Sequence, residues 1–312
     1  MGKSLTLMFH DVVPAGCFAL SGFCTIGADH YKLTQEQFEA HLAAITAATD
    51  QKPVRVTDDG WQNSFLFTMD DGGSSSLYVA DQLESRGWRG HFFIATDYIG
   101  TRGFLNAAQL LELSERGHCI GSHTSSHPIP IWSCTPEQIY VEWHSSRQKL
   151  ESIIGEPVTC GSVPGGAYTL SIAAAAAKAG YQNLFNSEPT STLHYVDGCR
   201  VLGRFGILRT TAPAEAAKLA SGDVFACSKQ QALWNTKKIL RKVAAKPYAA
   251  ARGFIMQRRY AESGAVATLS PVPETQTFND PLTSEIASRP LTSTDTTNVQ
   301  LHLRAKTPSA VD

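Results

Sequence analysis

Short runs of apolar residues alternate along the chain with longer stretches in which apolar residues recur every three or four positions. Apolar runs of this length, bounded by glycine and polar residues, are typical of strands buried on both faces. They predict strands at 5–9, 54–57, 65–69, 90–96, 118–122, 157–161 and 182–186, and two further strands near 200–208 and 222–227.

The stretches between these strands have the period of amphipathic helices. Thr34 and Gln37 have the spacing of a capping box, and apolar residues at helical spacing follow them. Further helices, each closed by a glycine, are predicted at 74–87, 106–116, 135–154 and 169–179. Alternating strands and helices imply a parallel sheet covered by helices, and about seven or eight such units favour a closed or nearly closed barrel.

Two regions near the C-terminus depart from this pattern. Residues 224–260 contain nine Lys and Arg residues and no acidic residue. We expect the barrel to occupy residues 1–228, followed by a basic helical segment at 229–260. That segment either packs on the barrel as a solvated helix or contacts an anionic membrane or an anionic glycan carrier. Residues 261–312 are rich in Ser, Thr and Pro, which predicts a disordered tail.

The composition is that of an ordinary globular protein, with 43% hydrophobic and 18% charged residues. A formal net charge of -1 gives no general attraction to nucleic acid. The seven cysteines are odd in number and contain no CxxC pair, which favours a reducing compartment over a disulfide framework. The first residues are a poor match to a signal peptide, and no apolar run reaches the ~18 residues of a membrane span. We therefore expect a cytoplasmic protein, with peripheral contact to the inner face of the membrane as an option for 229–260.

Two adjacent carboxylates, Asp70 and Asp71, directly follow the apolar strand 65–69. Side by side they repel each other and lose solvation, so their position needs a physical reason. In parallel α/β folds the chemistry lies at the carboxyl ends of the strands. Because His123 and Pro164 also follow predicted strands, we expect them at the same edge of the sheet as the two aspartates.

His123 and His127 are four residues apart in the sequence HTSSH. An HxxxH pair alone is common by chance, and here the serines and Pro128 indicate a loop rather than the HExxH helix of a zinc protease. One aspartate and two neutral imidazoles form a three-ligand site for zinc or a similar divalent ion, with a position open for water. The ion would lower the pKa of that water, and the second carboxylate could take its proton.

Two further motifs carry weaker signals. A second Asp-Asp-Gly, Asp58–Asp59–Gly60, follows a short strand that contains Arg55, and we interpret it as a hairpin turn. The sequence CGSVPGGAY at 160–168 places a rigid proline before two glycines. A backbone without side chains can approach a substrate closely and offer an N–H to a developing oxyanion, although Pro-Gly usually marks a turn.

Taken in this order, the motifs resemble the polysaccharide deacetylase family, which is also called the NodB-homology domain or carbohydrate esterase family 4. TMDDG at 68–72 is similar to the family's T-F-D-D-G block, and HTSSH at 123–127 to its H-[ST]-x-x-H block. SVPGG at 162–166 is similar to a degenerate R-x-P-x-G block. The start of the chain, FHDVVP, and the later FEAHL resemble members that act in bacterial glycan assembly. The resemblance covers about residues 5–225.

This resemblance implies a fold, a reaction and roles for individual residues. The fold is a distorted (β/α)7 barrel, and the reaction is metal-dependent hydrolysis of an N-acetyl, sometimes O-acetyl, group on a sugar. Asp70 would be the general base, and Asp71, His123 and His127 would hold the divalent ion, most commonly Zn²⁺. The Gly165 backbone N–H would help to bind the oxyanion.

The chain departs from the family at the residue that orients the base and at the general acid. Ser162 occupies the position of the motif arginine. Arg204 is a candidate replacement, the alternative being an ordinary surface arginine. The late L-x-H histidine is missing, since Cys227 or Ser228 stands in its place and no histidine occurs between 195 and 301.

We consider His10 the best substitute for the general acid, because it ends the first strand near the expected site. The alternative for His10 is a buried histidine that is hydrogen-bonded in the barrel mouth. His194, in a predicted loop, is a weaker candidate. His91 and His118 start strands and are expected at the opposite rim.

We interpret the chain as a metal-dependent hydrolase that removes an acyl group from an N-acylated sugar or glycan during polysaccharide biosynthesis, with no nucleic-acid partner. One alternative is a deformylase or amidase acting on a lipid-linked sugar, which the basic segment would suit. Another is a sugar-binding homologue that has lost turnover, which the missing arginine and late histidine would favour. The sequence does not determine the sugar, the acyl group or the oligomeric state.

Overall fold

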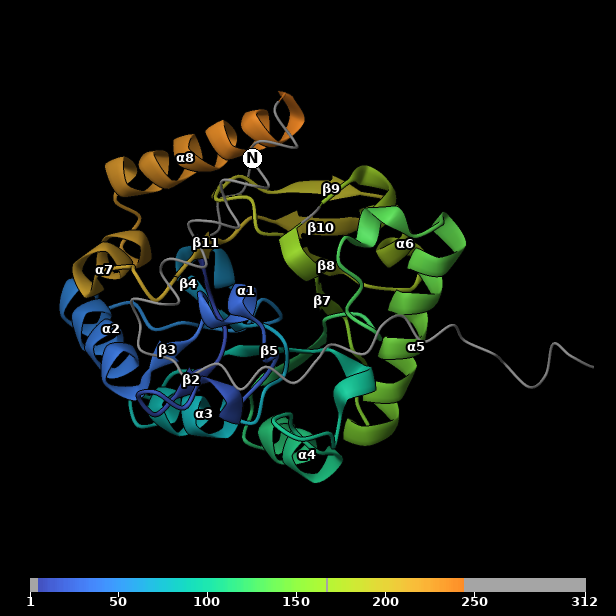
Figure 1. Ribbon diagram of the computed structural model, residues 1–312, viewed down its shortest axis with the longest axis horizontal. Coiled ribbons are helices and arrows are strands. Elements are labelled where there is room, and N and C mark those ends of the chain that lie inside the picture. The colour runs from blue at the N-terminus through green and yellow to red at the C-terminus, as the bar shows by residue number, and fades with distance from the viewer. Residues whose placement is uncertain (1–4, 167, 244–312) are drawn as a thin grey trace, which may run out of the picture. The chain divides into compact units, whose positions relative to one another are not determined.

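The computed structural model of the protein describes residues 5–166 and 168–243 (Figure 1). The strands are β1 (Leu5–Phe9), β2 (Val12–Val13), β3 (Leu33–Thr34), β4 (Phe65–Met69), β5 (His91–Ile94), β6 (Cys119–Ser122), β7 (Cys160–Ser162), β8 (Asn183–Phe185), β9 (His194–Val196), β10 (Cys199–Leu202) and β11 (Phe205–Gly206). The α-helices are α1 (Ile26–Asp29), α2 (Gln35–Ala48), α3 (Ser76–Glu84), α4 (Ala107–Glu115), α5 (Pro136–Ile154), α6 (Leu170–Lys178), α7 (Pro213–Ala220) and α8 (Val224–Val243).

Nine of the strands form one curled sheet in the order β11-β1-β4-β5-β6-β7-β8-β10-β9. Neighbouring strands run parallel throughout, except that β9 pairs antiparallel with β10 at one edge. Within the described residues the edge strands β11 and β9 do not pair, so the barrel stays open along one seam. The predicted distorted barrel is confirmed in this open form, with helices around the outside of the curl (Figure 1).

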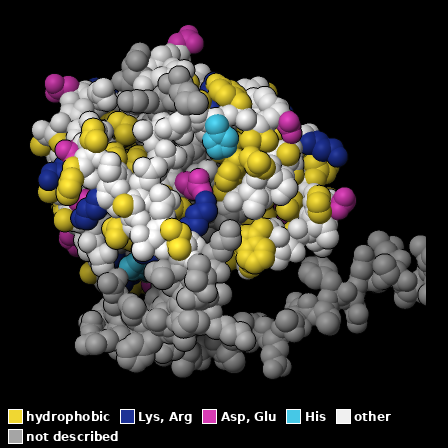
Figure 2. All heavy atoms as spheres, turned by 90° about the horizontal axis from the view of Figure 1, so that it is seen from above, with side chains coloured by type: hydrophobic (Ala, Val, Ile, Leu, Met, Phe, Trp, Pro, Cys, Tyr) yellow, Lys and Arg dark blue, Asp and Glu magenta, His cyan; other side chains and the backbone are white. Residues whose placement is uncertain are grey.

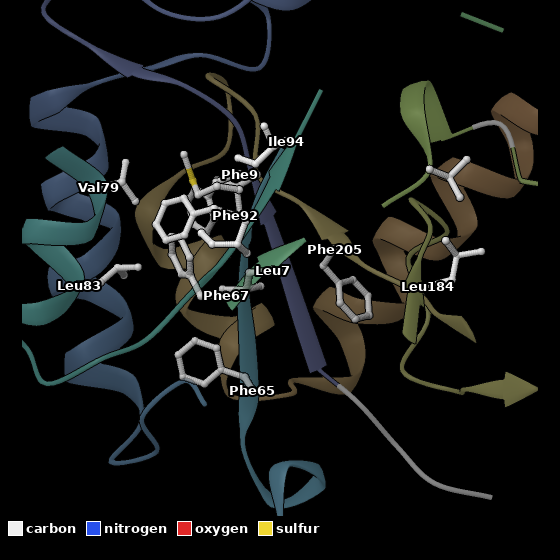
Figure 3. Close-up of a cluster of buried hydrophobic side chains, with 14 of the residues drawn as sticks. Leu7, Phe9, Phe65, Phe67, Val79, Leu83, Phe92, Ile94, Leu184 and Phe205 are labelled. Carbon is white, nitrogen blue, oxygen red and sulfur yellow. The ribbon is translucent and has the colours of Figure 1, made fainter. Parts of the chain in front are cut away.

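The sheet is buried on both faces, because successive residues of a strand point alternately toward the helices outside the curl and toward its interior. From β4, Phe65 and Phe67 lie on the side of Val79 and Leu83 of helix α3 (Figure 3). Leu66 belongs to a second buried cluster that also contains the side chains of Phe93, Phe185 and Leu202. Burial on both faces explains the continuous apolar runs from which the strands were predicted. It also leaves polar chemistry to the strand ends.

The predicted strands and helices are confirmed except at two places. No strand forms at 54–57, because the Val56 N–H donates to His91 Nε2 over 2.9 Å instead of pairing with a strand. The second exception is the predicted strand near 222–227, where helix α8 begins at Val224. Asp223 accepts a hydrogen bond from the Ala226 N–H over 2.8 Å and so caps that helix. The capping box of Thr34 and Gln37 at the start of α2 is confirmed.

The C-terminal predictions are covered only in part. The tail at 261–312 and the second half of the basic segment lie outside the described residues. Within the described ranges, no helix combines the length and the apolar character that a bilayer span requires.

Candidate functional site

The two aspartates leave strand β4 at the carboxyl edge of the sheet. The Asp70 N–H donates to the Phe9 carbonyl of β1 over 3.1 Å and extends the sheet ladder by one bond. The backbone then turns sharply, with φ at +78° for Asp71 and +79° for Gly72. Positive φ is unfavourable for a residue with a side chain, at about 1–3 kcal/mol. The turn lets the neighbouring carboxylates reach different partners.

Asp71 lies with His123 and His127 in a group that has the geometry of a metal site. One ligand atom from each residue lies within 4.8 Å of the other two. Asp71 Oδ1 is 3.5 Å from the Nε2 atoms of both histidines. Ligands held ~2.0–2.1 Å from a tetrahedral ion lie about 3.3–3.4 Å from one another, so the observed spacing fits a divalent ion such as zinc.

The loop that carries the two histidines is held in an unusual conformation by a carboxylate from helix α5. Thr124 and His127 have positive φ, and with Asp71 they make three of the four non-glycine residues in the described chain that do so. Glu142 Oε2 accepts the backbone N–H groups of Ser125 and Ser126 at 2.9 and 2.8 Å. These bonds hold the backbone of the loop between the two histidines.

Each histidine ring is oriented by a neighbour outside the ligand group. His123 Nδ1 lies 2.8 Å from the Ser162 carbonyl oxygen, so Nδ1 carries the proton and donates it there. This tautomer leaves the lone pair of Nε2 directed at the carboxylates, as a metal ligand requires. The His127 ring stacks on Phe23 with ring centres 4.6 Å apart.

Asp70 forms a fully buried ion pair with Arg204, which follows strand β10. Arg204 Nη1 and Nη2 donate to the two carboxylate oxygens of Asp70 over 2.6 and 2.8 Å. The remaining donors of Arg204 bond to Thr68 Oγ1, the Asn186 carbonyl and Ser162 Oγ. All five N–H donors of the guanidinium therefore have an acceptor. The alternative of an ordinary surface arginine is wrong.

The departure at Ser162 has a structural explanation. Ser162 Oγ accepts a bond from Arg204 Nη2 over 2.8 Å and donates one to Asp70 Oδ1 over 3.1 Å. The serine is completely buried. A large side chain on β7 would occupy the space that the Arg204 guanidinium takes. The small residue at 162 and the arginine at 204 therefore form one arrangement around Asp70.

The electrostatics of the site keep both carboxylates ionised. Burial alone would raise the pKa of Asp70, but the Arg204 guanidinium, with His123, outweighs it and holds that pKa well below the usual carboxyl range. Burial opposes ionisation of Asp71 in the same way, but the nearby imidazoles, that of His123 above all, outweigh it and lower the pKa of Asp71. Burial lowers the pKa of His127 to about 4, so its ring is neutral at pH 7, as a ligand must be.

The structure also places the remaining predicted site residues. His10 is close enough to both aspartates for its charge to contribute to their lowered pKa values, and its ring packs 4.6 Å from that of Tyr31. Its Nδ1 atom is buried and has no hydrogen-bond partner among the described residues. Gly165 is exposed in the 3-10 helix η5 (Pro164–Gly166), with φ at +61°.

The residues that were set aside lie away from this group. Asp58 accepts from the backbone and side chain of Arg55 within a turn, so the second Asp-Asp-Gly lies in a turn as predicted, although no strand precedes it. His194 is exposed and lies 2.8 Å from the Tyr168 hydroxyl. His91 bonds to Val56, and His118 to Glu84, at the starts of their strands.

Sequence reasoning missed Asp11, a buried carboxylate beneath the site. Asp11 accepts hydrogen bonds from Ser21 Oγ at 2.6 Å and Ser75 Oγ at 3.0 Å. A methyl group added at Gly73 would lie 1.9 Å from Asp11 Oδ1, so the second glycine after the aspartate pair is sterically required. Burial and the charge of Asp71 raise the pKa of Asp11. Its position in HDVVP gave no signal, because its partners come from distant segments.

Comparisons with known proteins identify a related family. Residues 57–184 match the family model "Polysaccharide deacetylase", a range that includes both aspartates, both histidines and the Pro-Gly-Gly loop. The chain is 27% identical over 167 residues to a Bacillus subtilis (strain 168) protein named "Putative polysaccharide deacetylase YxkH". That match covers 51% of this chain and 60% of the relative, less than two thirds of its length.

Solved structures share the fold. The polysaccharide deacetylase BC0361 from Bacillus cereus superimposes with a TM-score of 0.58 at 20% identity, over 70% of this chain and 69% of that one. The Streptococcus pyogenes deacetylase PplD, solved in complex with acetate, gives 0.58 at 16% identity, over 70% of this chain and 98% of that one. IcaB from Ammonifex degensii gives 0.57 at 16% identity with the same coverage.

Replacing Arg204 by Met should destabilise the protein by about 3–5 kcal/mol, because Asp70 is left buried without its counter-charge. Urea denaturation at pH 7 with a chelator present would measure the change. The exposed Arg102→Met is the control, with an expected change within about 0.5 kcal/mol.

The stability lost in Arg204→Met should be greatest at neutral pH and should decrease as the pH falls. Because the pKa of Asp70 is lowered in the folded protein, its pairing contributes stability at neutral pH that is lost as the pH falls below the ordinary carboxyl range. The difference between the wild-type protein and Arg204→Met should therefore shrink on acidification. A loss no larger than that of Arg102→Met at pH 7 would contradict a buried ion pair.

Proposed function

We propose that this chain, which carries a polysaccharide deacetylase domain, is a metal-dependent hydrolase that removes an N-acetyl or similar acyl group from a sugar unit of a glycan. The main support is the separation of two neighbouring carboxylates: Arg204 binds Asp70, whereas Asp71 faces two imidazoles. One carboxylate and two imidazoles favour Zn²⁺ or a similar ion. Bound there, the ion would supply Lewis-acid activation of water and of the amide carbonyl.

Asp70 is the general base in this proposal. Its Oδ1 atom accepts from Arg204 and Ser162, whereas Oδ2 accepts only one bond among the described residues. Oδ2 therefore keeps a lone pair that can accept a proton from water. Arg204 fixes the direction of this oxygen, as general-base catalysis requires.

The leaving amine needs a proton, and His10 is the proposed donor. Water oxygen bonds to the carbonyl carbon while its proton passes to Asp70. The carbon–nitrogen bond then breaks, and the nitrogen leaves with a proton from His10. The products are a free amino sugar and a carboxylic acid, which releases its remaining proton to solvent, and the proton on Asp70 passes back to His10 through water. The exposed backbone of Gly165 is the proposed N–H donor to the oxyanion.

His123→Ala should remove the bound divalent ion, because two ligands hold it much less well than three. Elemental analysis after dialysis is expected to fall from about one equivalent per chain to near none. His194→Ala removes an exposed histidine outside the group and should retain the metal. A full equivalent in His123→Ala would exclude the proposed ligand set.

Asp70→Asn should keep the metal but lower acetate release from N-acetylated sugars by about 10²–10⁴-fold, because the amide cannot accept the proton. Asp97→Asn, a change at an exposed position near the histidine loop, is the matched control. Assays over a panel of N-acetyl and N-formyl sugars would also separate deacetylase from deformylase activity. Unchanged turnover in Asp70→Asn would reject its role as base.

His10→Asn should slow hydrolysis of an N-acetyl sugar by about 10²–10⁴-fold while sparing an activated aryl acetate. The aryl oxide can leave without taking up a proton, whereas the amine must be protonated before it can leave. The two substrates therefore distinguish a general acid from a residue that only supports the fold. His194→Asn should change neither rate. Equal losses on both substrates in His10→Asn would refute the assignment.

A further inference from the structure

Helix α8 is attached to the body of the protein by one narrow face. Ala226 is buried, and Gln230 Nε2 donates to the Gly206 carbonyl at the end of β11 over 3.1 Å. On the same face Trp234 lies near the Pro-Gly-Gly loop, since a methyl group added at Gly166 would be 3.4 Å from its ring. These contacts fix which side of α8 points away from the body.

The outward side of α8 carries large apolar residues that no part of the described chain covers. The exposed fractions are 79% for Phe225 and 63% for Ile239, whereas Leu233, at 53%, lies on the side of the helix near Ala226 and Gln230. Phe225, Ala232 and Ile239 are seven residues apart, a spacing that keeps them close to one line along a helix. Elsewhere on the longer helices, as at Val141 of α5, exposed large apolar residues occur singly. The line on α8 is therefore a distinct apolar ridge.

The charge around this ridge is positive. No acidic residue occurs between 224 and 260, and nine Lys and Arg residues do. Lys229 and Lys238 each meet one carboxylate of the body, Glu215 at 3.3 Å and Glu188 at 2.8 Å. Exposed pairs of this kind are weak, so they do not prevent the lysines from binding another anion. Figure 2 views the side on which α8 lies in Figure 1 and shows hydrophobic side chains at the surface, with Lys and Arg as well as Asp and Glu among them.

This combination of apolar ridge and positive charge selects among partners. A second copy packed on the ridge would bring two segments of like charge together, which is unfavourable. A nucleic acid would use the lysines but leave the apolar ridge in water. A bilayer with anionic lipids accommodates both the apolar ridge and the lysines. The apolar side chains enter the boundary of headgroups and acyl chains, while the lysines reach the phosphates.

We propose that α8 is an interfacial helix that docks the protein on anionic lipid bilayers through Phe225 and Ile239, assisted by Lys229, Lys237 and Lys238 of the same helix. Because Trp234 on the opposite face lies at the Pro-Gly-Gly loop, docking brings the rim of the candidate site within about one helix diameter, ~10 Å, of the lipid surface. This inference rests on α8 and not on the proposed reaction.

The test is co-sedimentation of the full chain with liposomes of phosphatidylcholine alone or with 30% phosphatidylserine, at low and at moderate salt. The protein should bind the anionic vesicles, more weakly as salt rises, and should not bind phosphatidylcholine alone. Phe225→Ser with Ile239→Ser should reduce binding by roughly tenfold or more, and Lys237→Glu with Lys238→Glu by a similar factor.

The matched controls are Val141→Ser, an exposed apolar position on α5, and Lys52→Glu with Lys178→Glu, exposed lysines elsewhere. These should retain binding. Absence of wild-type binding to anionic vesicles would overturn the proposal, as would equal losses in the controls. A wild-type dimer that Phe225→Ser converts to a monomer would assign the ridge to a second copy instead. Acyl release from a soluble sugar, measured on the same variants, should be unchanged, which separates failure of docking from failure of the proposed reaction.

Discussion

The candidate site depends on one buried ion pair, between Arg204 and Asp70. Placing a carboxylate at the end of a strand buried on both faces is costly unless it is paired and hydrogen-bonded. Arg204 meets this need with five satisfied donors, which also tie together the ends of β4, β7 and β8. The same contacts hold Asp70 ionised and fix its orientation. A lysine could not replace this arrangement, because its single ammonium lacks the planar fork.

Once Asp70 is neutralised in this way, its neighbour is free to face the histidines. The positive φ of Asp71 turns the second carboxylate toward His123 and His127, so that two adjacent like charges have separate counter-charges. Bonds from outside the group, above all those of Glu142, hold the backbone of the histidine loop. The ligand group is thus held by the scaffold, as preorganised sites require.

Helix α8 connects this site with the surface. Its inner face reaches the strand ends through Gln230 and approaches the Pro-Gly-Gly loop with Trp234, while its outer face presents apolar and basic residues. The residues of the candidate site and the exposed residues of α8 are therefore distinct sets. This separation has a structural basis, because α8 joins the body after the last strand of the sheet.

The sequence by itself determined most strands of the parallel sheet, the helices between them and the residues of the candidate metal group, because these depend on local periodicity and on short motifs. It did not predict β2, β3, β9, α1 or α7. Two strands predicted from the sequence, at 54–57 and 222–227, do not form. In both places the backbone N–H groups bond to side chains, those of His91 and Asp223, and not to a neighbouring strand. Only the tertiary structure shows that Arg204 pairs with Asp70. It also shows that Asp11 and Glu142 form hydrogen bonds that hold the loops around the candidate site. These partners lie between 10 and 134 residues away along the chain, and no local pattern records a contact of that kind.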